Sequence, residues 1–372
     1  MSITDRHENL MRTHSDGLDV VTFGRSRCET HYITARPHGD DSLAVFREVA
    51  KAVREREARV VSQTVFGDRT RAAEGIAELE AAMGSIDWPV TWLDGGSGLM
   101  GTQVSALAGV DVDPIRFGGK LVGCEFQDEH ARYCFLGNLM PAHVTQARPD
   151  QVLDTFELME AILGQAGMSL DHVVRTWLYI DSILDWYGEL NQARTQFFSD
   201  RDVFAHMMPA STGIGVANTA GSSLVAECIA VESRGGAVSV HEVDSPLQCE
   251  ASDYKSSFSR AAEVIMPDHR RLYVSGTASI ADDGTTVYEN DVELQIARTM
   301  EVVQAILRSR GMDWHDISRG VAYFRDIADV AIFDKYCSDH GVPRGVLLET
   351  PAVVCRDDLL FELEANAIAG TQ

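Results

Sequence analysis

Apolar residues recur at helical spacing in two distant segments of the chain, and these segments match each other without a gap. Residues 151–183 laid on residues 295–327 are identical at roughly a third of the positions. In each segment, apolar side chains three or four residues apart predict an amphipathic helix that ends near Gly167 or Gly311. Self-similarity over so long a period indicates duplicated domains and not a short-repeat solenoid.

The flanking sequence extends this match to a whole unit. A strand, a second helix, a turn with Pro209 or Pro351 and a last strand follow the first helix, and a strand precedes it. The predicted unit is β, α, β, α, β with an antiparallel hairpin in front, an α+β architecture. The expected elements of the two copies are strands 133–139 and 272–280, helices around 152–163 and 296–307, strands 173–180 and 317–324, helices 186–198 and 331–340, and strands 224–231 and 359–368.

The N-terminal part carries a fainter version of the same pattern, which we interpret as a third, diverged copy. Gly, Ser, Pro and acidic residues cluster near 113–119 and within 235–252, and such clusters are typical of linkers. We therefore expect three units, at residues 1–118, 119–236 and 250–372. The elements expected in the first unit are strands 20–23, 60–66 and 90–93 and helices 43–56 and 69–83.

Charge narrows the range of functions. The chain has 56 Asp and Glu against 32 Lys and Arg, a formal net charge of −24. Such a charge repels a phosphate backbone, so we expect no nucleic-acid partner and no binding to an anionic membrane. An anionic substrate would have to meet a local cluster of arginines or lysines.

Cysteine usage and hydropathy indicate a protein of the cytoplasm. The seven cysteines are scattered without C-x-x-C spacing, which suggests neither a disulfide framework nor a structural zinc site. Residues 1–19 are polar and do not resemble a signal peptide. No uninterrupted apolar run is long enough for a membrane span.

Residues 96–101 match G-x-G-x-x-G, but the sequence after them predicts a poor helix. Without a following helix this pattern is a loop and not a dinucleotide site. No other phosphate-binding or metal-binding motif is present and the histidines are dispersed, so we expect neither a cofactor nor a metal.

The last predicted strand carries the strongest candidate for catalysis. Strict alternation places Glu362, Glu364 and Asn366 on one face, opposite the apolar residues between them. In the middle copy the matching strand keeps one carboxylate, Glu227, and has Val225 at the other position. A carboxylate present in one copy alone suggests a site there. The alternative is that both glutamates form ion pairs with arginines of a neighbouring sheet.

Two arginines occupy matching strands. Arg175 and Arg319 face the same way as Tyr179 and Tyr323, either as structural ion-pair partners or as bidentate ligands of an anionic substrate. Cys355 has no histidine near it in sequence, so we interpret it as an apolar filler and not as a nucleophile.

Taken together, these features resemble the YjgF/RidA fold, whose subunits have this order of elements and form trimers with sites between subunits. Its imine-hydrolysing members carry an arginine after Pro-Ala, where this chain has Ser211 and, in the last copy, Val353. That departure argues against an imine deaminase. Three fused copies resemble instead the chorismatases, which are similar to a YjgF trimer within one chain. The segments that carry the resemblance are RYCFLG (132–137), VRTW (174–177), NQAR (191–194) with Phe197 and Phe198, PASTGIG (209–215), SFSRA (257–261), VSGTAS (274–279) and VCRDDLLFELE (354–364).

The resemblance implies an internal pseudo-trimer that cleaves chorismate and releases pyruvate as a monomer. Glu362 would be the acid that protonates the methylene carbon of the enolpyruvyl ether, because burial and a dianionic substrate raise a carboxyl pKa. Arginines would hold the two carboxylates of the substrate. The residues implied for binding in the cleft between the middle and last copies are Arg175, Tyr179, Arg194, Thr212, Gly213, Ser275, Gly276, Ala278 and Cys355.

The resemblance leaves two products open. Members that form 3-hydroxybenzoate resemble this chain in the cysteine at position 355, whereas Ala278 resembles the members that hydrolyse chorismate to a dihydroxycyclohexadiene carboxylate. We expect 3-hydroxybenzoate and pyruvate as the products, with hydrolysis or imine deamination as the alternatives.

Overall fold

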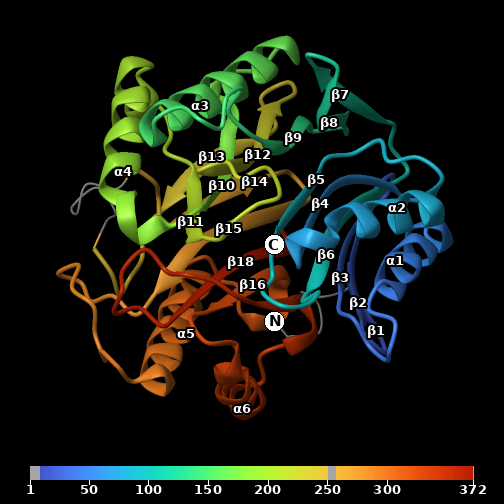
Figure 1. The fold of residues 1–372 in the computed structure, drawn as a ribbon. Coiled ribbons are helices and arrows are strands. Elements are labelled where there is room, and N and C mark those ends of the chain that lie inside the picture. The colour runs from blue at the N-terminus through green and yellow to red at the C-terminus, as the bar shows by residue number, and fades with distance from the viewer. Residues whose placement is uncertain (1–8, 250–256, 372) are drawn as a thin grey trace.

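The computed structural model describes residues 9–249 and 257–371, and within these ranges it contains three six-stranded sheets (Figure 1). All three sheets have one strand order, in which three antiparallel strands are followed by the last strand of the unit, the strand after the first helix and a parallel edge strand. The chain thus repeats one topology three times, as the sequence predicts. Residues 1–8, 250–256 and 372, which the expected units include, lie outside the described residues.

The bounds of the elements agree closely with those expected from the sequence. The first unit comprises β1 (Leu10–Ser15), β2 (Leu18–Gly24), β3 (Glu29–Ala35), α1 (Ala44–Glu55), β4 (Arg59–Gly67), α2 (Ala72–Met83), β5 (Val90–Asp94) and β6 (Gly101–Ala108). The second comprises β7 (Val112–Phe117), β8 (Lys120–Gln127), β9 (Ala131–Leu139), α3 (Arg148–Gln165), β10 (Val173–Ile180), α4 (Ile183–Asp200), β11 (Ala210–Gly215) and β12 (Leu224–Ser233). The third comprises β13 (Ser239–Val243), β14 (Ala261–Ile265), β15 (His269–Ala278), α5 (Val292–Ser309), β16 (Ile317–Phe324), α6 (Val330–His340), β17 (Leu347–Pro351) and β18 (Phe361–Gly370).

The edge strands of the second and third units differ from the sequence-based expectation. β11 and β17 lie where turns around Pro209 and Pro351 were expected, because short, glycine-containing edge strands lack a clear alternation. Ser211 of β11 pairs with Thr176 of β10, and Leu347 of β17 pairs with Gly320, the equivalent residue of β16. In the third unit the residue equivalent to Ser211 is therefore Leu347, and not Val353 as the sequence suggests. The last strand of the first unit is likewise β6, which follows the glycine-rich loop 96–101, and not β5.

The sheets place the first division earlier than expected, and the third sheet begins at Ser239, before the expected start of the third unit at 250, whereas the expected end of the second unit at 236 lies between β12 and β13. Gly118 and Gly119 form the turn of the β7–β8 hairpin, with φ of 55° and 81°, and are not a linker. Paired Gly residues suit a two-residue hairpin, which needs positive φ at both positions. We therefore place the divisions between units at residues 109–111 and 234–238.

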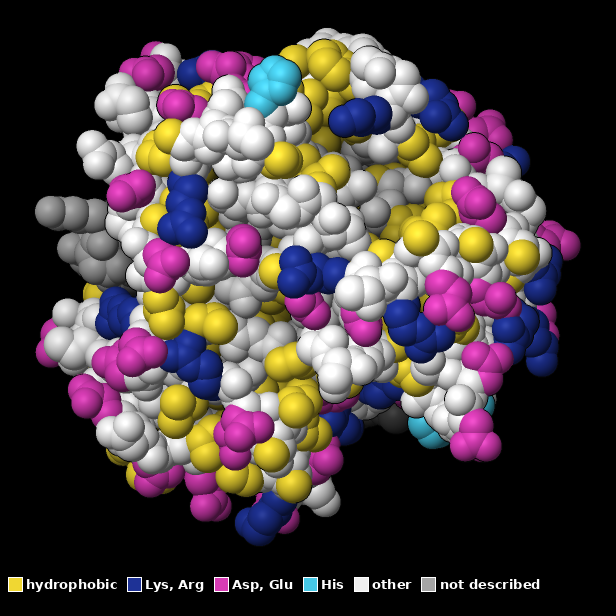
Figure 2. Space-filling view, in the orientation of Figure 1, with side chains coloured by type: hydrophobic (Ala, Val, Ile, Leu, Met, Phe, Trp, Pro, Cys, Tyr) yellow, Lys and Arg dark blue, Asp and Glu magenta, His cyan; other side chains and the backbone are white. Residues whose placement is uncertain are grey.

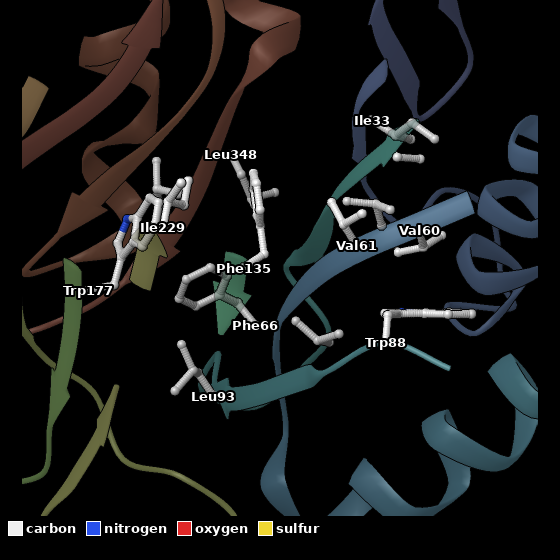
Figure 3. Close-up of a cluster of buried hydrophobic side chains, with 14 of the residues drawn as sticks. Ile33, Val60, Val61, Phe66, Trp88, Leu93, Phe135, Trp177, Ile229 and Leu348 are labelled. Atoms are coloured by element: carbon white, nitrogen blue, oxygen red, sulfur yellow. The ribbon is translucent and has the colours of Figure 1, made fainter. Parts of the chain in front are cut away.

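The helices lie on the outside of the molecule and the three sheets face its centre (Figure 1). In the third unit, Phe361 and Leu363 of β18 pack with Phe333 of α6 in one apolar cluster. The central cluster joins all three units, and Figure 3 shows Phe66, Phe135, Trp177 and Leu348 meeting there. Burying a side chain of this size contributes roughly 1.5–3 kcal/mol, so the shared centre holds the units together.

Within the described residues, no helix combines the length and the apolar character that crossing a membrane requires.

Candidate active site

The three sheets can be superposed position by position through their strand registers. Tyr323 pairs with Glu362 across β16 and β18, and Tyr179 pairs with Val225 across β10 and β12. In the first unit the equivalent pair, across β4 and β6, is Phe66 with Gly101. The structure thus supports the sequence alignment of Glu362 with Val225, and it adds that the first unit has a glycine there.

Glu362 opens into a cavity of about 210 Å³ between the second and third units. We call this cavity the acid cleft. The second unit contributes one helix and the edge strand β11, and the third unit contributes β15, β18 and the segments before β14 and β18. The lining residues are Tyr187, Asn191, Arg194, Ser211, Gly213, Phe258, Arg260, Gly276, Ala278, Ile280, Cys355, Arg356 and Glu362.

Three arginines give the acid cleft a positive wall. Arg194 lies on α4 and donates to Asn191 Oδ1 at 2.7 Å, and Arg260 donates to the carbonyl oxygen of Cys249. Arg356 donates to the carbonyl oxygen of Gly284 at 2.7 Å. On the protein surface basic side chains are dispersed among acidic ones, as on the face in Figure 2. Three guanidinium groups around one cavity are therefore the local cluster that an anionic substrate requires in a chain of charge −24.

Glu362 is buried but unpaired. Its exposure is 4%, and it makes no hydrogen bond or ion pair within residues 9–249 and 257–371. Burial first, and then the charge of Glu364, raise the pKa of Glu362 to about 8, while Arg175 acts in the opposite direction. The carboxyl group is therefore protonated at neutral pH and has a proton to give.

Gly276 allows the acid to lie against the backbone of β15. A Cβ atom at position 276 would overlap Oε1 of Glu362 and lie 3.2 Å from Cγ2 of Thr212. Any side chain at this position would displace the carboxyl group, so glycine leaves the room that the acid occupies.

A second carboxylate lies beneath the acid cleft. Glu364 accepts from Nη2 of Arg175 at 2.9 Å and from Nε1 of Trp177 at 2.8 Å, and both donors belong to β10 of the second unit. The same Nη2 donates to Oγ1 of Thr212 at 2.6 Å. The alternative that both glutamates form ion pairs thus holds for Glu364 and not for Glu362.

The structure brings only part of the predicted binding set to the cavity wall. Arg194, Gly213, Gly276, Ala278 and Cys355 line it together with Glu362. The other predicted residues, Arg175, Tyr179, Thr212 and Ser275, lie behind the wall, as their partners show.

Their partners explain these positions. Arg175 is fully buried against Glu364, and Tyr179 donates to Oε2 of Glu227 at 3.3 Å, toward the first unit. Ser275 donates to the carbonyl oxygen of Ser259 and accepts from the backbone of Ser211, so it ties the two units together.

Two of the three arginines of the wall are absent from the binding residues that the sequence predicted. Arg260 and Arg356 both lie within segments that carry the family resemblance, and the need for a cluster of positive charge was itself predicted. Both arginines therefore carried a signal in the sequence, their place in those segments. Asn191 and Phe258 of the wall also lie within those segments, at 191–194 and 257–261, whereas Tyr187 lies outside them and is placed by long-range packing alone.

Cys355 borders the acid cleft as a neutral thiol. Burial, with Glu362 as the next cause, raises its pKa to about 12. The thiolate is the reactive form of cysteine, so this side chain shapes the cavity and supplies no nucleophile.

One group of carboxylate and imidazole side chains in the described part of the chain is close enough to hold a metal ion. Its ligand atoms, from Glu129, His130 and Asp268, lie within 4.8 Å of one another. Asp268 is also bonded to His269 at 2.6 Å, and none of the three lines the acid cleft.

Comparison with known proteins agrees with this architecture. The family model of endoribonuclease L-PSP matches residues 138–232 and again residues 254–369. A chorismatase crystal structure has a TM-score of 0.64 at 17% identity, over 91% of this chain and 98% of that chain. A YjgF gene product from E. coli matches 34% of this chain and 98% of its own at 18% identity and a TM-score of 0.28.

One curated relative has a name that states a reaction product. A 3-hydroxybenzoate synthase from Streptomyces hygroscopicus is 26% identical over an alignment of 264 positions that covers 62% of this chain and 73% of the relative. The expected α+β fold of three YjgF-like units, with a first unit that the family model does not match, is confirmed. The resemblance to the chorismatases is confirmed at the level of the fold.

Proposed function

The chain belongs to the endoribonuclease L-PSP family, and from this membership and the chemistry of the acid cleft we propose that it cleaves chorismate to pyruvate and 3-hydroxybenzoate. The names of two similar proteins, a chorismatase and a 3-hydroxybenzoate synthase, support this substrate.

The unpaired, protonated Glu362 carries the proposal. Cleavage of an enol ether starts with protonation of carbon, which needs an acid that is still protonated at neutral pH. A carboxyl group with a pKa of about 8 is half protonated at pH 8 and almost fully protonated at pH 7. Because Glu362 has no partner in the described structure, no hydrogen bond has to break before it donates.

The proposed reaction balances without a cofactor. Glu362 gives its proton to the methylene carbon, and the electron pair of the double bond forms the new C–H bond, which leaves an oxocarbenium ion. The ring hydroxyl oxygen attacks this cation and forms a cyclic ketal. Loss of the ring C–H proton then breaks the bond between the ring and the attacking oxygen and leaves an aromatic hemiketal. Collapse of the hemiketal breaks the remaining ether bond and moves the hydroxyl proton to the phenol oxygen, which releases pyruvate and hydroxybenzoate. The ring proton lost on aromatisation returns the acid to its starting state. No water is consumed, so the two products together have the composition of chorismate.

The arginine wall accounts for binding. Chorismate is a dianion, and Arg194, Arg260 and Arg356 are the cations that line the same cavity as the acid. Each charge-assisted contact with a carboxylate contributes on the order of 1.5–3 kcal/mol. Bound carboxylates also raise the pKa of Glu362 further, which keeps the proton on the acid until it is transferred.

The hydroxybenzoate product depends on keeping water from the cation. Ala278, Ile280 and Cys355 form the apolar part of the wall beside Glu362. Cys355 and the curated relative favour internal attack, whereas Ala278 resembles the hydrolytic members. Hydrolysis would consume one water and give a dihydroxycyclohexadiene carboxylate with the same pyruvate.

The test is to incubate the purified protein with chorismate, follow pyruvate with lactate dehydrogenase, and separate the second product by chromatography against standards. We expect pyruvate and 3-hydroxybenzoate in equal amounts. Glu362→Gln should lower kcat/KM at least about 100-fold, because general acid catalysis alone contributes on the order of 10²–10⁴-fold. Glu227→Gln is the matched control, since it makes the same change on the matching strand of the second unit, and it should retain activity.

A diene product would keep chorismate cleavage and replace internal attack by hydrolysis. Folded protein that releases no pyruvate, or a Glu362→Gln variant as active as Glu227→Gln, would refute the proposal.

A further inference from the structure

The position two residues after the acid has a different occupant in each unit. Glu364, Glu227 and Gln103 occupy equivalent positions in the three sheets, because they pair with Val321, Trp177 and Thr64 at the same point of the strand register. Arg175, Arg319 and Ser62 are likewise equivalent on the neighbouring strands.

Three pairs of residues from different units can therefore be compared within one chain: Glu364 with Arg175, Gln103 with Arg319, and Glu227 with Ser62.

Only one of these pairs is complete. Glu364 of the third unit meets Arg175 of the second, and Nε1 of Trp177 holds its other oxygen. Gln103 of the first unit donates to the carbonyl oxygen of Gly320 at 2.8 Å, beside Arg319.

The other two positions lack a charge pair of this kind. Glu227 of the second unit is bonded to Thr64 of the first at 3.2 Å, where the arginine place holds Ser62. Arg319 makes no ion pair or hydrogen bond within the described chain and rests 5.6 Å from the ring of Trp177. The complete carboxylate–guanidinium pair thus occurs only beneath the position where the chain has the acid.

A general need of the fold does not explain this coincidence. Two of the three equivalent positions pack without the pair, so neither the sheet nor the interface between units requires it. Replacing a buried ion pair by neutral side chains is often harmless to stability, which makes its retention at one position a sign of another role.

We propose that Glu364 is a positioning residue of the acid cleft: Arg175 and Trp177 hold its carboxylate beneath Glu362, where it keeps the proton of Glu362 available for donation. This inference rests on the proposed function and assigns to Arg175 a role one layer beneath the substrate. Glu364 and Glu362 lie two residues apart on the same face of β18, so the two carboxyl groups are close enough to repel each other's charge.

Other groups around the acid act in both directions. Arg175 opposes Glu364, because its charge favours the ionised form of Glu362. The remaining titratable or charged groups that face Glu362, taken from every element packed around it, are Tyr323 of β16, Tyr187 and Arg194 of α4, Arg260 before β14, and Cys355 and Arg356 before β18. Of the charged groups in the described surroundings, Glu364 and Arg175 shift the pKa of Glu362, and Glu364, which has the larger effect, opposes ionisation.

The experiment compares Glu364→Gln with Glu227→Gln, the same substitution at the equivalent position of the second unit. Two measurements are made on each full-length variant, the pH dependence of kcat/KM for chorismate and a ¹³C NMR titration of the glutamate carboxyls. The Glu362 signal is assigned by its absence in Glu362→Gln.

In Glu364→Gln we expect the Glu362 midpoint to fall by about one pH unit, because the repelling charge is gone while Arg175 remains. The protonated fraction at pH 8, and with it kcat/KM, should then drop about fivefold. Glu227→Gln should leave the midpoint in place. A Glu364→Gln midpoint equal to that of the wild type would overturn the proposal and make the pair purely structural.

Two further results keep the test decisive. If Glu364→Gln does not fold because Arg175 is left unpaired, the double variant Arg175→Met with Glu364→Gln replaces the whole pair by neutral groups. Its midpoint should fall less than in the single variant but in the same direction, and an unchanged midpoint contradicts the proposal. The NMR titration needs no substrate, so failure to cleave chorismate and failure of Glu364 to act on Glu362 are separate outcomes.

Discussion

The acid cleft and the interface between the third and first units are built from equivalent strands, yet only the former is hollow. Strand register matches Ser211 and Gly213 of β11 to Leu347 and Glu349 of β17. Arg36, the residue after β3, is equivalent to Ala278: Ala278 pairs with Glu362 in the acid cleft, and Arg36 lies beside Gly101, the residue equivalent to Glu362. We call the second region, defined by Gly101, Arg36, Leu347, Leu348 and Glu349, the filled interface.

Side chains occupy the filled interface where the acid cleft has space. Arg36 donates to Oε2 of Glu349 at 3.0 Å and to the carbonyl oxygen of Leu347 at 2.5 Å. A Cβ atom on Gly101 would lie 2.7 Å from Cδ1 of Leu348 and 2.5 Å from the carbonyl oxygen of Ala35, so no carboxyl group fits. The difference shows that the cavity exists because Gly213 and Ala278 are small where the filled interface has Glu349 and Arg36. Glu362 occupies part of the space that they leave.

Transplanting the pair of the filled interface should have the largest effect. Ala278→Arg together with Gly213→Glu places a guanidinium and a carboxylate in the space of the acid cleft, in the arrangement that Arg36 and Glu349 adopt. We expect chorismate cleavage to fall at least about 1000-fold, because the substrate can no longer reach Glu362. Circular dichroism should show the native fold. Retained activity in this variant would mean that the reaction does not take place in this cavity.

Removing one arginine from the acid cleft should weaken binding of chorismate, whereas removing one from the filled interface should lower the stability of the fold. Arg356→Met takes a cation from the acid cleft and should raise KM for chorismate about 10- to 100-fold, the equivalent of one charge-assisted contact. Arg36→Met in the filled interface should leave KM unchanged and lower the free energy of unfolding by about 1–3 kcal/mol, because Glu349 loses a half-buried partner. Steady-state kinetics and urea unfolding of both variants check this, and equal KM values would contradict it.

The pH dependence of activity should report the acid. Because Glu362 must be protonated to donate, kcat/KM should be level near neutral pH and fall about tenfold per pH unit above about pH 8. A fall that begins near the ordinary carboxyl pKa of 4.5 would show that burial does not hold the proton on Glu362.

The smallest effect is on stability. The folded-state pKa of Glu362 is raised to about 8 from 4.5, so between these values the unfolded chain releases a proton that the folded chain keeps. Its contribution to stability is therefore complete below pH 4.5 and is lost as pH rises through 8. Glu362→Gln removes this loss, and its Tm relative to the wild type should rise by about 2–5 °C between pH 5 and pH 8.5. The same experiment on Glu227→Gln, with its carboxyl outside the acid cleft, provides the comparison.

Much of the fold follows from local sequence. The gapless match of 151–183 to 295–327 predicts β10 and β16 with their observed bounds, because an amphipathic helix and a fully buried strand each leave a periodic apolar pattern. The edge strands β11 and β17 escaped prediction because they gain their pairing from β10 and β16 and not from a pattern of their own. The Gly118–Gly119 turn was misread for a related reason, since glycines mark a hairpin and a linker alike.

The candidate site divides in the same way. The sequence by itself determined that Glu362 and Glu364 share one face of the last strand and that the second unit lacks the first of these carboxylates, because strand alternation and internal repetition are local properties. Tertiary structure alone decided that Glu364 meets Arg175 while Glu362 stays unpaired, and that Arg194, Arg260 and Arg356 surround one cavity. These relations join residues from two units, and the way those units pack depends on the volume of every side chain between them, which no periodic pattern encodes.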